Sequence, residues 1–304
     1  MAEKVSMATT WLQGCSGCHM SLLDLHKGLT DIIELVDIKY SPIIDIKEIP
    51  QVTVGLIEGA VSNEENEVIL KQFRERSEIL IAFGTCACSG GITGLRNLVS
   101  REAVLQCGYV DTPTTVDGKI PSDPVLPKLK KEVKAINHVV DVDYYIPGCP
   151  PLAVNIKEAL LDVVEGREIK QKTRNLCEAC GRIKEKMLVA QRDFLSDEVV
   201  SVHELDHIDD KLCFLEQGVL CMGPATREGC GALCPSANVP CRGCQGPPHG
   251  IYDQGAKLIN CLSSILPAGG MMFQEDIVGV GYCHSMPVSR FSHISKQKGM
   301  VPNE

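Results

Sequence analysis

Cysteines follow several of the predicted strands, and their positions restrict the folds that the chain can adopt. A β-type run at residues 5–12 leads into a Ser-Gly turn bracketed by two cysteines, and strands predicted at 78–83 and 141–146 each end near another. Parallel strands bring their carboxyl ends to one edge of an open α/β sheet, where such sheets place their sites. Thiolates gathered at that edge can bind one metal centre. The four residues are Cys15, Cys18, Cys86 and Cys149.

The first half of the chain alternates between β-type runs and runs with helical spacing. Residues 78–83 are continuously apolar, which is typical of strands that a parallel sheet buries on both faces. The alternation predicts an α/β fold with a flavodoxin-like, doubly wound parallel sheet. The other strands are expected at 32–40 and 52–57, and the helices after Cys18 and at 62–76, 129–136 and 154–164.

The chain changes character after Gly166, where a polar stretch resembles a linker. We therefore expect a flavodoxin-like domain at 1–166 and a cysteine-rich domain at 167–304. The second region has few β-type runs and too few apolar residues for a conventional core, so metal centres would have to organise it. Taken in chain order, its cysteines form two sets of four. One set is Cys177, Cys180, Cys213 and Cys221, and the other is Cys230, Cys234, Cys241 and Cys244.

Composition favours metal binding over other uses of these thiols. The N-terminus lacks an apolar signal core and no apolar run is long enough for a bilayer, so a cytoplasmic protein without a membrane span is expected. In that reducing compartment, 16 cysteines argue against a disulfide framework. The net charge of −9 argues against nucleic acid as a partner. Iron–sulfur clusters and structural zinc both accept four thiolates. The irregular gaps favour iron–sulfur clusters, and zinc stays the alternative.

Glu58 ends a predicted strand and should lie at the same sheet edge as the first four cysteines. It is either a proton-relay or interface carboxylate, or a helix-capping or solvated glutamate. The cysteines outside the three sets are interpreted as packing residues. They are Cys88, Cys107, Cys261 and Cys283.

Several motifs together resemble a known family, the small, electron-transferring subunit of nickel–iron hydrogenases. The similarity keeps the motif order and extends over nearly the whole chain. The motifs are Trp11 to Cys18, Ile57-Glu58-Gly59, Gly84-Thr85-Cys86, Gly148-Cys149-Pro150-Pro151, Cys177 with Cys180, Leu215-Glu216-Gln217-Gly218, Cys221-Met222-Gly223-Pro224, Cys230 and Pro240 to Cys244.

The resemblance implies a row of three clusters and no catalytic residue in this chain. The proximal cluster, nearest the nickel–iron site of a large partner subunit, would be held by the first cysteine set. The medial cluster would be held by Cys230, Cys241 and Cys244, and the distal cluster by Cys177 and the three cysteines grouped with it. The family's respiratory members carry histidine at the position of Cys177 and proline at that of Cys234. Both differences predict three 4Fe-4S clusters with thiolate ligands only.

The pattern is most similar to cytosolic methanogen hydrogenases that do not reduce the deazaflavin cofactor. In that group the small subunit passes electrons through a small iron–sulfur subunit to the heterodisulfide reductase complex. A zinc-stabilised interaction scaffold is the alternative from another class of protein. A flavin-binding reductase is disfavoured because Cys15 to Cys18 occupies the turn where a phosphate-binding loop would lie.

Overall fold

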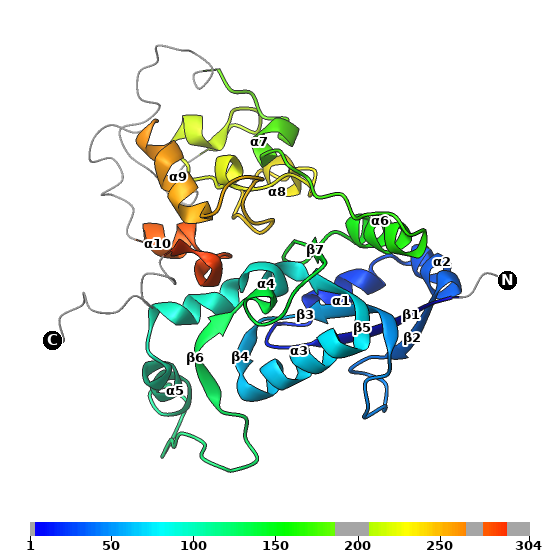
Figure 1. The fold of residues 1–304 in the computed structure, drawn as a ribbon. Coiled ribbons are helices and arrows are strands. Elements are labelled where there is room, and N and C mark those ends of the chain that lie inside the picture. Colours follow the sequence, from blue (N-terminus) through cyan, green and yellow to red (C-terminus); the bar gives the residue numbers. More distant parts are fainter. Residues whose placement is uncertain (1–3, 186–206, 266–275, 291–304) are drawn as a thin grey trace. The chain divides into compact units, whose positions relative to one another are not determined.

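The structure is a computed structural model, and it describes residues 4–185, 207–265 and 276–290. It divides into two compact units. The first contains the described residues up to Lys170 together with residues 286–290, and the second contains those from Gln171 to Ser285. From the sequence, we expected the division after Gly166 and a second domain that continues to the C-terminus. Figure 1 gives the order of the elements.

The first unit contains the predicted sheet, with every strand pair in it parallel. The strand order is β2-β1-β3-β5-β7, which is the flavodoxin-like order once the strands of this sheet are numbered along the chain. The predicted fold class is therefore confirmed. The strands are β1 (Val5–Trp11), β2 (Val36–Tyr40), β3 (Val52–Glu58), β5 (Ser77–Phe83) and β7 (Tyr144–Ile146).

Helices cover both faces of the sheet, so residues that alternate along a strand enter two different cores. Met7, Leu56 and Phe83 pack on one face with α1 (Gly17–Leu23), α2 (Lys27–Leu35) and α6 (Ala153–Val164). Their neighbours Ala8, Ile57 and Ala82 pack on the other face with α3 (Glu64–Arg76) and α4 (Gly84–Ser89). This double burial explains the continuous apolar runs of the central strands.

Two predicted elements are wrong. Residues 32–40 do not form one strand, because Ile32 lies in α2 and only β2 is extended. Ile32 is buried against the α6 side of the sheet, and this burial outweighs the β-propensity of its branched side chain. The segment predicted as a helix at 129–136 contains β6 (Leu129–Lys134), which pairs antiparallel with β4 (Val61–Asn63). A local pattern does not contain that long-range pairing.

The second unit is built from short helices and loops. It includes α7 (Leu176–Ala179), α8 (Leu233–Ser236), α9 (Gln254–Ser263) and α10 (Ile277–Gly281), with 3-10 turns at Phe214–Gln217 and Gly223–Ala225. Contrary to the expectation from its composition, it has a small hydrophobic core. Leu176, Phe214 and Leu258 are almost fully buried there, and the core includes the side chains of three cysteines, Cys213, Cys221 and Cys241.

Within the described residues, none of the helices combines the length and apolarity that a membrane crossing needs.

Candidate metal centres

The register of the sheet places the ends of four strands beside one another. Trp11 pairs with Glu58, Glu58 with Phe83, and Phe83 with Ile146. The turns that follow β1, β5 and β7 carry the first cysteine set, so the register brings these turns to one edge of the sheet. Backbone contacts join two of the turns, since Thr85 N donates to Gly148 O at 2.9 Å and Gly148 N donates to Thr85 Oγ1 at 3.2 Å.

The thiols of the first set gather around Cys18, which is 7% exposed. Burial raises the pKa of the Cys18 thiol, and so do Glu58 and the thiols of Cys86, Cys149 and Cys15 in that order. Burial likewise raises the pKa of Cys86. Cys15 and Cys149 are exposed, so this group opens to the surface of the unit. All four thiols predicted to meet at the sheet edge are thus brought together.

Two glycines let the backbone approach these sulfurs more closely than any other residue would. A Cβ atom at Gly84 would lie 2.1 Å from Cys18 Sγ, and one at Gly91 would lie 2.6 Å from Cys86 Sγ. Both glycines also adopt a positive φ, of 83° and 55°. A cradle of soft thiol donors lined by bare backbone fits an iron–sulfur cluster, whose sulfides accept backbone N–H groups.

Glu58 is buried beneath this group and is tied to the first turn of α1. It is 1% exposed. Its Oε2 accepts the backbone N–H of His19 at 3.1 Å, its Oε1 that of Cys18 at 3.4 Å, and it also pairs closely with the His19 ring. The other ring nitrogen of His19 lies 2.6 Å from Thr9 Oγ1. Glu58 therefore caps the turn that carries Cys18, which is the helix-capping alternative. The sequence reasoning missed His19, whose only local signal is its position directly after Cys18.

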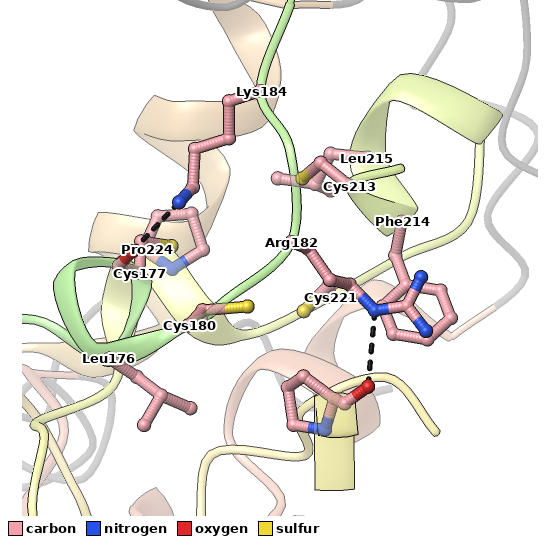
Figure 2. Close-up of a pocket in the computed structure, with 12 residues that line it drawn as sticks. Leu176, Cys177, Cys180, Arg182, Lys184, Cys213, Phe214, Leu215, Cys221 and Pro224 are labelled. Carbon is pink, nitrogen blue, oxygen red and sulfur yellow. Dashed lines mark hydrogen bonds between the residues drawn. The ribbon is translucent and has the colours of Figure 1, made fainter. Parts of the chain in front are cut away.

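The second site is a pocket in the second unit that contains the predicted distal set. Cys177, Cys180, Cys213 and Cys221 all line it, and Figure 2 shows them around a common space. Arg182 and Lys184 line the same pocket. The Lys184 ammonium donates to Cys177 O at 2.8 Å. A Cβ at Gly223 would lie 3.0 Å from Cys177 Sγ and 3.6 Å from Cys221 Sγ, so the backbone again approaches the thiols closely.

Burial raises the pKa of three thiols in this pocket, those of Cys177, Cys213 and Cys221. It raises the pKa of Cys177 to about 12, with further increases from the thiols of Cys221, Cys213 and Cys180, while Lys184 partly opposes the shift. Burial also raises the pKa of Cys221 to about 11. A cationic metal centre has the opposite effect, because it binds the thiolate and displaces the proton.

The predicted medial set is less completely assembled in the structure. Cys241 and Cys244 interact, and burial raises the pKa of Cys241 to about 12. Cys230 is half-buried against the same hydrophobic core as Cys241. Cys234 lies on α8 and is exposed. Cys241 also contacts one cysteine of the distal set, because its backbone N–H donates to Cys221 Sγ at 3.4 Å.

The cysteines outside the sets differ from one another. Cys88 Sγ donates to Ala82 O at 3.5 Å, and Cys261 and Cys283 are half-buried. Cys107 is exposed on α5 (Arg101–Tyr109), so its interpretation as a packing residue is wrong.

In the described part of the chain, no three His, Cys, Asp or Glu side chains lie close enough together to hold one metal ion. A four-iron cluster makes a different demand, because each of its thiolates binds its own iron.

Comparison with known proteins finds one matching family model and several similar hydrogenase subunits. The family model described as "NADH ubiquinone oxidoreductase, 20 Kd subunit" matches residues 15–163. The chain is 40% identical over 313 aligned positions to a subunit of the F420-non-reducing hydrogenase of Methanothermobacter marburgensis, covering 98% of this chain and 100% of that protein. It is 44% identical over 263 positions to a subunit of the vhu F420-non-reducing hydrogenase of Methanococcus voltae, covering 86% and 88%.

Among solved structures, one chain of a crystal structure of NAD+-reducing [NiFe]-hydrogenase in the H2-reduced state is similar to this protein. The two are 39% identical with a TM-score of 0.54, and the match covers 55% of this chain and 95% of that chain.

Proposed function

This chain belongs to the hydrogenase small-subunit family that includes these F420-non-reducing hydrogenase subunits, and on that premise we propose that it conducts electrons away from hydrogen oxidation on a nickel–iron large subunit. The hydrogen-activating site of such enzymes lies on the large subunit, so this chain serves the enzyme without a catalytic residue of its own. One observation carries the proposal: thiols from distant parts of the chain meet at the sheet edge and in the pocket of the second unit.

An iron–sulfur cluster, when bound, takes up and releases single electrons. In this proposal the residues of the chain hold three 4Fe-4S clusters. The first cysteine set provides the proximal ligands, and the pocket cysteines provide the distal ligands. The medial ligands are Cys230, Cys234, Cys241 and Cys244.

The remaining residues hold these ligands in place. Glycines bring the backbone close to the sulfurs, and burial excludes water, which strengthens each electrostatic interaction with a bound cofactor. Glu58 fixes the first turn of α1, and with it Cys18. A proton-relay role for Glu58, through its contact with His19, is a further part of the proposal.

The proposed electron acceptor is a small iron–sulfur subunit that serves a heterodisulfide reductase complex, and the proposed location is the cytoplasm. This finer assignment is supported by the similarity to F420-non-reducing hydrogenases over nearly the full length of the chain. Four-thiolate clusters carry more negative charge than clusters with an imidazole ligand, which lowers their reduction potentials and suits low-potential acceptors.

The proposed cluster content is tested by measuring iron, zinc and acid-labile sulfide per chain in protein that has been purified without air. We expect about twelve irons with matching sulfide, which corresponds to three four-iron clusters. Near-zero iron with two or three zinc ions would reject the electron-transfer role and favour the zinc-stabilised scaffold. About eleven irons would retain electron transfer but remove Cys234 from the ligands.

A second assay separates this subunit from its enzyme. The chain alone should not oxidise hydrogen with an artificial acceptor, and activity should require the large subunit. Hydrogen oxidation by the isolated chain would contradict the proposal.

A further inference from the structure

The guanidinium group of Arg182 is buried, and its hydrogen bonds to the described residues all go to neutral acceptors. Arg182 is 7% exposed and lines the pocket of the distal cysteines. It donates to Leu212 O at 2.7 Å, Asp209 O at 2.8 Å and Pro235 O at 3.1 Å, and also bonds to the side-chain oxygen of Asn238. Each of these acceptors is neutral. The guanidinium also lies 3.8 Å from the centre of the Phe214 ring.

This arrangement satisfies the hydrogen bonds of Arg182, but among the described residues it supplies no negative charge to balance the guanidinium. Moving a cation from water into a protein interior is energetically unfavourable, and neutral carbonyls or an aromatic ring offset only part of that penalty. No described carboxylate forms an ion pair with Arg182. The pocket it lines, however, contains four thiols that become anionic when they bind iron. A 4Fe-4S cluster with four thiolates has a net charge of about −2 when oxidised and about −3 when reduced.

Lys184 adds a second positive charge to the same pocket. Its ammonium donates to Cys177 O at 2.8 Å, and it interacts electrostatically with the thiols of Cys177 and Cys213. Figure 2 shows both cationic side chains among the pocket cysteines. Glu216 acts in the opposite sense, since its carboxylate also faces Cys213, and its Oε2 accepts the backbone N–H of Glu185 at 3.1 Å. Two cationic side chains therefore line the pocket, and the carboxylate of Glu216, which is not among the lining residues, interacts with one of its cysteines.

We propose that Arg182 and Lys184 are positioning residues whose charges balance the thiolate-bound distal cluster and raise its reduction potential. Reduction adds a negative charge to the pocket, and nearby cations stabilise the reduced form more than the oxidised form. The low dielectric of the site keeps this effect from being screened, because Arg182 is buried. The proposal rests on the proposed function, since it requires a cluster at the distal cysteines.

Arg182 also connects three segments that carry predicted ligands. It follows Cys180 by two positions, the carbonyls of Asp209 and Leu212 precede Cys213, and Pro235 follows Cys234 directly. One side chain therefore holds parts of the distal and the medial ligand sets together. We expect changes at Arg182 to alter both clusters, and changes at Lys184 to alter the distal cluster alone.

The experiment is a potentiometric titration of the complete hydrogenase complex that carries Lys184→Met. The oxidation state of each cluster is monitored by electron paramagnetic resonance. The resonance that is lost or changed in Cys180→Ser identifies the distal cluster. We expect Lys184→Met to shift the electron equilibrium of that cluster at least tenfold toward the oxidised form, which corresponds to about 59 mV for one electron. Lys184→Arg keeps the charge and should retain the wild-type potential.

Lys257→Met is the matched control. Lys257 is also half-buried in the second unit and interacts with Cys261, which belongs to none of the proposed ligand sets. This variant should leave the distal potential unchanged. Arg182→Met should lower the potential as well, but it removes several hydrogen bonds and can prevent folding. The Lys184 variants therefore decide the outcome.

An unchanged distal potential in Lys184→Met, with iron and sulfide contents equal to wild type, would overturn the charge-balance proposal. Equal shifts in Lys184→Met and Lys257→Met would overturn it too, because the effect would then be unrelated to the pocket. A wild-type protein purified without air that contains no iron would instead reject the proposed function itself.

Discussion

At the scale of single residues, Glu58 provides the clearest example of a side chain whose partners define its role. The carboxylate is almost completely buried, yet it accepts hydrogen bonds from the turn that carries Cys18. Removing it would leave those N–H groups and His19 without their acceptor in a region that excludes water. Its contribution to stability can therefore be measured separately from any proton transfer.

Glu58→Ala should destabilise the protein by about 1–3 kcal/mol, the usual cost of leaving buried donors unsatisfied. Glu58→Gln should cost less, because its amide oxygen still accepts one of the two backbone N–H groups. The measurement is the urea concentration at the midpoint of unfolding, with unfolding monitored by circular dichroism under anaerobic conditions. Equal midpoints for wild type and Glu58→Ala would show that the cap contributes nothing.

Cys234 is the proposed ligand with the least support from its surroundings, since it is exposed on a short helix. Cys234→Ala should leave the medial cluster with three thiolates. The expected result is about one iron fewer per chain and a new three-iron resonance. Cys261→Ala is the matched control, because it removes a half-buried thiol from the same unit without changing a proposed ligand set. Iron content equal to wild type in Cys234→Ala would exclude this residue as a ligand.

At the scale of elements, one carboxylate joins α3 to the β4–β6 pair. Glu67 accepts from Lys71 on its own helix at 2.6 Å and forms a close ion pair with Lys130 of β6. Hydrogen bonds from Lys130 and then Lys71 lower the pKa of Glu67 to about 2. Because the pKa in the folded state is depressed, this stabilisation is complete above the ordinary value of 4.5 and is lost as the pH falls toward 2.

Glu67→Gln should lower the free energy of unfolding by about 1 kcal/mol at neutral pH. This value is at the upper end of the contributions that partly exposed ion pairs make to stability. The loss should shrink in 1 M salt, where the Debye length is only about 3 Å. Glu65→Gln, in the same helical turn but exposed, is the control and should have almost no effect. A Glu67→Gln effect that does not depend on salt would mean that packing, and not charge, joins the two elements.

At the scale of the whole molecule, cluster binding and protonation are linked. The metal-free thiols of Cys177 and Cys241 have a pKa of about 12, raised first by burial from an ordinary value of 9.0. They are therefore neutral at pH 7, whereas iron binds the thiolate. Each thiol that becomes a ligand must release one proton, so iron loading has to become more favourable as the pH rises.

Reconstitution of metal-free protein with iron and sulfide should therefore be more complete at pH 9 than at pH 7. The apparent affinity should rise about tenfold per pH unit for each thiol that loses its proton on binding. Iron per chain is the readout, and loaded protein kept at both pH values shows whether the clusters themselves survive. The same iron content at both pH values in freshly loaded protein would contradict the linkage.

The sequence by itself determined the sheet and the meeting of the first four cysteines. Buried parallel strands are short apolar runs that can be recognised locally, and their carboxyl ends must share one edge. The chain order of the cysteines likewise grouped the four thiols of the distal pocket, although order alone did not require that grouping. Binding of clusters by these thiols stays a prediction.

Only the tertiary structure decided the features that depend on partners distant in the chain. Glu58 caps a turn 39 residues away, and Arg182 reaches across 53 residues to Pro235. The strand β6 exists because it pairs with β4, and Ile32 is helical because of what buries it. Burial and hydrogen-bond partners are properties of contacts between segments, and no local pattern of residues specifies which segments will meet.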